Sequence, residues 1–123
     1  MKENEMTIDI AKQFSAYPSG REPKDGDNNG ERFRNEILIP ALNDVIDGKD
    51  GAAILVVDID GCRTFGSSFL EEAFGGLARV PAFRFIEAMK KLKIKCTKPH
   101  LQIYHDAIIE YLNDARAGYS APA

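Results

Sequence analysis

The sequence has few of the residues that hold metals or cross-link small domains. Its 123 residues include only two histidines and two cysteines, Cys62 and Cys96, which do not form a C-x-x-C pair. A disulfide framework or a structural zinc site would therefore lack suitably spaced ligands. We expect reduced cysteines, no metal and no cofactor.

Long apolar runs and a strong excess of one charge are also missing. No apolar segment approaches the roughly 20 residues that span a bilayer, and Met1–Ser15 lacks the apolar stretch of a signal peptide. The formal charge is −3, with acidic and basic residues interspersed, whereas nucleic-acid binding usually requires a basic patch. We therefore expect a cytoplasmic protein that binds neither membranes nor nucleic acid.

Length and composition indicate a single globular domain over residues 1–123. The chain is 44% apolar and 28% charged, which is close to the average for globular domains, and its length is typical of one domain. We expect an ordered core over about residues 6–117 and a flexible tail over residues 118–123.

Alternating strand and helix patterns predict an α/β fold. Short runs rich in β-branched residues predict strands at Met6–Phe14, Ala52–Ile59 and Leu92–Thr97. Helical spacing of apolar residues predicts helices at Gly30–Asp47, Ser68–Arg79, Ala82–Lys91 and Pro99–Ala117. The continuous apolar run at Ala52–Ile59 is typical of a central parallel strand covered on both faces. Together these patterns predict a mixed, mostly parallel sheet packed with about four helices.

Local signals refine the boundaries of these elements. Asn28 with Glu31, and Ser68 with Glu71, have the spacing of capping pairs at helix starts. Pro40 should kink or split the first long helix, because it lacks an N–H and its ring clashes with the preceding turn. The polar segment Ser15–Asn29 is rich in glycine and proline, and loops of that length are often functional.

The segment Ile54–Leu77 carries the strongest functional signal. A buried strand ends in a short turn, and Ser67 and Ser68 then begin a helix. Free N–H groups and the positive end of the helix dipole would stabilise a phosphate on a serine at this position. As the predicted N-cap, Ser68 would use its hydroxyl for capping, so Ser67 is the better candidate for modification.

This segment, ILVVDIDGCRTFGSSFLEEAFGGL, resembles the STAS-like domain family of unknown function, which is related to sulphate transporter and anti-sigma factor antagonist domains. The upstream stretch GREPKDGDNNGERFRNEILIPAL is similar to the N-terminal half of that family. The downstream stretch LKIKCTKPHLQIYHDAIIEYLNDA is similar to its C-terminal end. The resemblance covers about Met6 to Ala117 and implies a single STAS-like domain.

Anti-sigma factor antagonists carry a D-S-S-G-like motif at the matching helix start, and a kinase phosphorylates a serine there to release a bound partner. In this sequence the serines match, whereas the aspartate is replaced by Gly66 and the glycine by Phe69. The resemblance implies a non-catalytic regulatory or scaffold module whose partner is an ATPase- or kinase-type regulator.

We expect that partner to bind the Gly66–Leu70 helix start and the Ser15–Gly30 loop. The candidate switch residues are Ser67 and Ser68, and the candidate contact residues are Gly66, Ser67, Phe69, Arg21 and Arg32. The sequence also leaves a homodimer open.

Two other functions fit parts of the sequence. The string VVDIDGCRT resembles the first motif of haloacid-dehalogenase-type phosphatases, in which Asp58 would be the nucleophile and Asp60 the general acid, with magnesium at the phosphate. Cys62 replaces the threonine of that motif, and too few residues follow for the rest of that fold. Alternatively, the loop with Arg21 and nearby Arg32 could sense a small molecule or nucleotide, although the pattern G-x-x-x-x-G-K-[ST] is absent.

Overall fold

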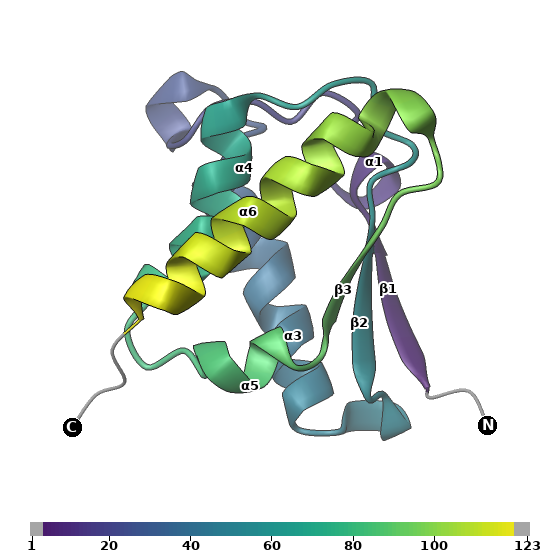
Figure 1. The fold of residues 1–123 in the computed structure, drawn as a ribbon, viewed down its shortest axis with the longest axis vertical. Coiled ribbons are helices and arrows are strands. Elements are labelled where there is room, and N and C mark those ends of the chain that lie inside the picture. The colour runs from purple at the N-terminus through teal and green to yellow at the C-terminus, as the bar shows by residue number, and fades with distance from the viewer. Residues whose placement is uncertain (1–3, 120–123) are drawn as a thin grey trace.

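The structure, a computed structural model, describes residues 4–119 and contains a three-stranded parallel sheet packed with helices (Figure 1). The strands are β1 (Glu5–Asp9), β2 (Ile54–Asp58) and β3 (Leu92–Lys95), in the sheet order β1-β2-β3. The α-helices are α1 (Ile10–Gln13), α2 (Gly30–Phe33), α3 (Ile39–Ile46), α4 (Ser67–Phe74), α5 (Phe85–Met89) and α6 (Gln102–Gly118). This is the mixed α/β architecture that the alternating patterns predicted.

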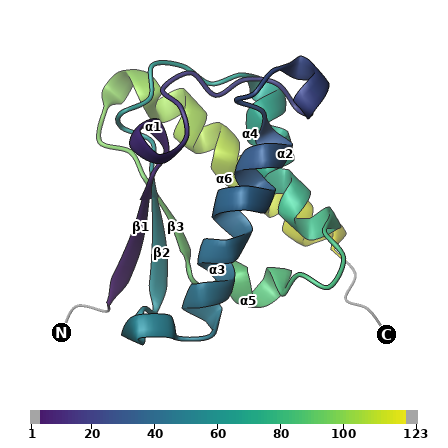
Figure 2. The ribbon, with the colours of Figure 1, turned by 180° about the vertical axis from the view of Figure 1, so that it is seen from behind.

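The helices α2 to α6 lie on one face of the sheet (Figures 1 and 2). Alternate residues of each strand, such as Ile8, Val57 and Ile94, point into the hydrophobic core that these helices cover. The intervening residues point away from the core, and Val56 of β2 is one of them. β2 is therefore central, as predicted, but the prediction that both of its faces are covered is wrong within the described part of the chain.

The first strand is shorter than its pattern predicted. β1 ends at Asp9, and one turn of helix, α1, replaces the second half of the predicted strand Met6–Phe14. The Asp9 side chain caps this turn by accepting a hydrogen bond from the backbone N–H of Lys12 at 3.1 Å. The turn directs both Ile10 and Phe14 toward the core, because residues four apart share one side of a helix.

The predicted helix Gly30–Asp47 forms as three consecutive parts. α2 leads into a π-helical segment, Arg34–Leu38, which continues into α3. The wider π turn leaves Pro40 in the first turn of α3, where its missing N–H costs no hydrogen bond. The N-cap is Asn29 rather than Asn28, since the side-chain oxygen of Asn29 accepts a hydrogen bond from the N–H of Arg32 at 2.9 Å.

The helical region after β2 begins earlier and is less regular than predicted. α4 begins at Ser67, and from Gly75 to Arg79 the chain continues as a 3-10 helix. The predicted helix Ala82–Lys91 is reduced to α5, because Ala82 has a φ of 63°, which an α-helix does not allow.

The C-terminal elements follow the predicted order with shifted ends. β3 stops at Lys95, two residues before the predicted end, and a 3-10 turn at Pro99–Leu101 precedes α6. α6 includes Gly118, the first residue of the predicted flexible tail, and residues 120–123 of that tail lie outside the described residues. Between residues 4 and 119, no helix is long and apolar enough to cross a membrane.

Phenylalanine rings occupy the part of the core between α2 and α4. Phe33 and Phe69 are fully buried, and their ring centroids lie 5.7 Å apart. Phe14 contacts both rings, at 5.3 Å and 6.0 Å. Aromatic pairs at such distances contribute about 0.5–1.5 kcal/mol beyond the burial of their area. This packing fixes the start of α4 relative to α2.

Candidate functional site

The start of α4 exposes two serines. Gly66 is the N-cap and has no side chain to use for capping, and Ser67 and Ser68 are both exposed. The predicted capping box of Ser68 and Glu71 is wrong, because Ser68 lies one residue inside the helix and Glu71 binds arginines instead. Both serines therefore stand in the first turn of an eight-residue helix, where backbone N–H groups and the helix dipole favour negative charge.

The Ser15–Gly30 loop lies directly against this helix start. The N–H of Gly66 donates a hydrogen bond to the carbonyl of Pro18 at 3.0 Å. Ser19, Gly20 and Asp25 of the loop line a hollow of about 400 Å³ together with Gly66, Ser67 and Ser68. The structure thus brings together the two segments that were separate candidates in the sequence.

Hydrogen bonds within the loop fix its conformation. The N–H of Gly30 donates to the carbonyl of Gly20 at 2.9 Å. Gly20 has a φ of +91°, and a Cβ on it would lie 2.6 Å from the Cβ of Asp25, so only glycine fits there. The backbone N–H groups of Glu22 and Arg21 each donate to the Asp25 carboxylate at 3.0 Å, and they lower the pKa of Asp25.

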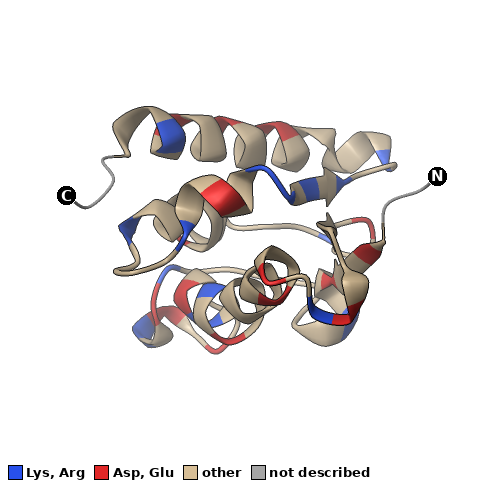
Figure 3. Cartoon of the chain, turned by 90° about the horizontal axis from the view of Figure 1, so that it is seen from below, with Lys and Arg blue, Asp and Glu red and all other residues tan. Residues whose placement is uncertain are grey.

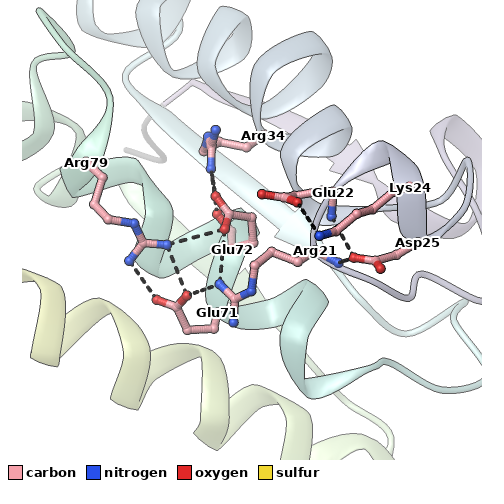
Figure 4. Close-up of polar contacts among 8 residues, drawn as sticks. All are labelled: Arg21, Glu22, Lys24, Asp25, Arg34, Glu71, Glu72 and Arg79. Carbon is pink, nitrogen blue, oxygen red and sulfur yellow. Dashed lines mark hydrogen bonds and ion pairs between the residues drawn. The ribbon is translucent and has the colours of Figure 1, made fainter.

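Arg21 ties the loop to two acidic residues of α4 (Figure 4). Its Nη1 lies 2.5 Å from Oε1 of Glu71 and 3.0 Å from Oε1 of Glu72. Arg34 binds the other carboxylate oxygen of Glu72 and donates to its backbone carbonyl at 3.0 Å. Arg79 binds both carboxylate oxygens of Glu71, at 2.9 Å and 3.0 Å. These five side chains form an ion cluster that joins the loop, the π-helical segment and α4.

The ion cluster keeps both carboxylates ionised. The hydrogen bond from Arg79 is the main cause of the lowered pKa of Glu71. Burial opposes the ionisation of Glu72, but hydrogen bonds from Arg34 and Arg21 outweigh it and lower the pKa of Glu72. Sequence reasoning missed the ion cluster because it assigned Glu71 to a capping box. The available signal was an acidic pair on the polar side of α4, with several arginines elsewhere in the chain.

The predicted contact residues divide into three groups. Gly66 and Ser67 line the hollow, and Arg21 supports it from the ion cluster. Phe69 is 0% exposed, so the prediction that it contacts a partner is wrong: its side chain packs in the core. Arg32 is exposed on α2 but lies outside the lining of the hollow, and its Nε is 3.2 Å from Oε2 of Glu36.

The two aspartates of the phosphatase hypothesis hold the carboxyl ends of β2 and β3. Oδ2 of Asp58 lies 3.5 Å from Nζ of Lys95, and Oδ1 of Asp58 accepts a hydrogen bond from the N–H of Asp60 at 2.9 Å. Asp60 accepts hydrogen bonds from the N–H and the hydroxyl of Thr97, at 2.7 Å and 2.8 Å. These contacts favour a structural role for both carboxylates. In the described part of the chain, no three His, Cys, Asp or Glu side chains form a group that could hold a metal ion.

Comparisons with known proteins support the resemblance noted in the sequence. No curated protein and no solved structure matches the chain. The family model of a STAS-like domain of unknown function matches residues 29–100. This range begins at the N-cap of α2 and includes the α4 start and the acidic pair, while most of the Ser15–Gly30 loop precedes it. Because the match covers more than half of the chain, the protein belongs to the family of STAS-like domains of unknown function.

Proposed function

We propose that this domain is a non-catalytic regulatory or scaffold module of the cytoplasm that binds a partner protein through the α4 start and the Ser15–Gly30 loop. The observation that carries this proposal is the exposed pair Ser67 and Ser68, which lines one hollow together with an ordered loop. The resemblance to anti-sigma factor antagonists suggests an ATPase- or kinase-type regulator as the partner. The ion cluster supports the proposal, because it holds the two segments in a fixed relation before any partner arrives.

Tyr17 offers this surface an aromatic contact. Its side chain is 60% exposed, and it immediately precedes Pro18, the residue whose carbonyl accepts the hydrogen bond from Gly66. Tyrosines at the centre of an interface often carry much of the binding energy. Tyr17 therefore takes the role that the sequence analysis gave to the buried Phe69.

A phosphate on Ser67 would regulate such binding through charge. It would add about −1.5 to −2 charges at neutral pH to a hollow that the acidic residue Asp25 also lines. The first turn of α4 can hold this phosphate through its N–H groups. The hollow itself becomes more negative, so we expect the modified form to bind its partner more weakly.

Affinity capture with matched variants tests the proposed surface. Wild type, Ser67→Asp, Tyr17→Ala and the control Asn113→Asp are used as baits, since Asn113 is exposed on α6 and its substitution makes the same charge change away from the hollow. We expect wild type and the control to capture the same partner in equal amounts. Ser67→Asp and Tyr17→Ala should capture little or none of it. Titration with the purified partner should then give at least a tenfold higher Kd for Tyr17→Ala, which corresponds to about 1.4 kcal/mol. Equal recovery of every captured protein by all four baits would count against this surface.

A further inference from the structure

The sheet face opposite the helices has no cover among residues 4–119 (Figures 1 and 2). Thr7 and Lys93 are exposed on it, and Val56 between them is half-buried and lies outside the hydrophobic core. All-parallel sheets are normally covered on both faces, because their crossovers and packing partners leave neither face to solvent. The open face is therefore a candidate surface for a partner.

Side chains on the open face form rows across the three strands. The parallel register pairs each outward residue of β1 with one of β2, and pairs β2 in turn with β3. Lys91 lies in the turn directly before β3, and its carbonyl accepts a hydrogen bond from the N–H of Leu55 at 2.8 Å, which belongs to the Leu55–Leu92 pair of the ladder. From β1 to β3, the complete rows are Thr7–Val56–Lys93 and Asp9–Asp58–Lys95, and Glu5 pairs with Ile54 at the end of the sheet where the turn with Lys91 leads into β3.

The rows separate charge across the sheet. Both complete rows end in a lysine on the β3 side, and Lys91 lies just before β3. On the β1 side, Glu5 and Asp9 are carboxylates, and Oδ1 of Asp9 also caps α1. Figure 3 shows the resulting basic colour on β3 and acidic colour on β1. Between them on β2, the apolar Val56 is half-buried, whereas Ile54 is only 8% exposed. A surface that is acidic at one edge and basic at the other is complementary to a copy of itself.

We propose that the open face binds a second copy of the chain around a two-fold axis that runs parallel to β2. This rotation places β1 of each copy over β3 of the other, so that Glu5 lies opposite the turn that holds Lys91, and Asp9 lies opposite Lys95 of the second copy. Val56 lies at the axis and meets Val56 of the second copy. An axis perpendicular to the strands would instead place lysines over lysines and carboxylates over carboxylates, so charge selects the first arrangement.

The composition of the face also sets the strength of this dimer. Asp58 lies at the axis and meets Asp58 of the second copy, a repulsion that the N–H of Asp60 and Lys95 of its own chain reduce, and Lys95 is shared with Asp9 of the second copy. Three strands of four or five residues form a patch of roughly 250 Å² on each copy, well below the roughly 800 Å² per partner of a standard specific interface. The ion pairs lie at an edge accessible to water, where salt screens them. We expect a weak dimer that forms with rising protein concentration and dissociates at high salt.

Sedimentation velocity from micromolar to millimolar protein, at low and high salt, measures this association. The two test variants are Lys91→Glu/Lys93→Glu and Glu5→Lys/Thr7→Lys, which each place like charges opposite one another. We expect each alone to dissociate at least tenfold more readily than wild type. In an equimolar mixture of the two variants, the new glutamates on the β3 side of one variant lie opposite the new lysines on β1 of the other. We therefore expect the two variants to associate with each other. The control Lys90→Glu/Lys98→Glu alters two exposed lysines just outside β3 and should associate like wild type.

Three results would overturn the dimer. The first is a wild type that stays monomeric over the whole range, which would leave the open face to solvent or to a different partner. The second is a control as weakened as the strand variants. The third is a mixture that does not associate although both variants keep the circular dichroism spectrum of wild type.

Discussion

Gly30 of α2 lies close against the backbone of α4, and replacing it with alanine should destabilise the fold. An added Cβ would lie 2.7 Å from the carbonyl oxygen of Phe69, 3.0 Å from the Cβ of Glu72 and 3.1 Å from the backbone nitrogen of Ala73. Two of these three atoms belong to the α4 backbone and cannot rotate away as the end of a side chain could. The two helices must therefore move apart.

The size of the effect follows from two opposing contributions. Overpacking in a close contact costs about 1–3 kcal/mol, whereas alanine gains up to about 1 kcal/mol over glycine in a helix. Separating the helices also loosens the contact between the rings of Phe33 and Phe69. We expect a net loss of about 1–2 kcal/mol for Gly30→Ala, which in a domain of this size lowers Tm by roughly 3–10 °C.

Urea denaturation followed by circular dichroism measures this loss, with Gly118→Ala as the control. Gly118 is the last residue of α6, and a Cβ there would have no atom within 4 Å. This variant should match or slightly exceed wild type in stability, because it gains helix propensity without a clash. If Gly30→Ala kept the wild-type midpoint while the control behaved as expected, the explanation by close approach would be refuted.

Two further predictions concern ionisable groups. The carboxylates of Glu71 and Glu72 have lowered pKa values in the folded state, so they stabilise the fold above their ordinary pKa of 4.5 and this contribution is lost as the pH falls below it. In Glu72→Gln, the urea midpoint should therefore fall less than in wild type as the pH is lowered below 4.5. A fall as large as that of wild type would contradict this account. Burial raises the pKa of Cys62 to about 12, so iodoacetamide at neutral pH should label the half-exposed Cys96 well before Cys62. Mass spectrometry of the digested protein measures both, and equal labelling would show that the fold opens around Cys62.

Periodicity in the sequence predicted the order of the elements but not the places where local geometry changes. The strand pattern at Met6–Phe14 continues past Asp9, and only the capping hydrogen bond to Lys12 shows where the strand ends. Pro40 predicted an irregularity in the first long helix, but the π-helical segment keeps the helical spacing of apolar residues approximately, so its form was not predicted. Similarly, the positive φ of Ala82 has no signal in the helical pattern of its segment.

The candidate site was predicted in its parts, and its assembly was not. The serines and the loop could be identified from local patterns, but Arg21 and Glu71 are 50 residues apart in the sequence and 2.5 Å apart in the structure. Whether two residues this far apart in the sequence come into contact depends on the whole fold, so local patterns could not predict this ion pair. Phe69 shows a different error: Leu70, Ala73 and Phe74 are its buried neighbours on α4, and this spacing already indicated an inward position. Matching the residue to a family motif led to the wrong assignment.

The architecture of α4 makes binding and stability separable. The apolar residues of α4, Phe69 among them, pack in the core. Its acidic pair, Glu71 and Glu72, binds Arg21 of the loop. Ser67, in contrast, is exposed and is not the N-cap of the helix. A substitution of Ser67 should therefore change partner binding while leaving the unfolding midpoint almost unchanged, and a substitution of Glu72 should change both. The open sheet face lies on the other side of the sheet from α4 (Figure 2). Dimerisation through that face would leave both α4 starts accessible, so one dimer could hold a partner at two sites, and a partner with two matching sites would bind with increased avidity.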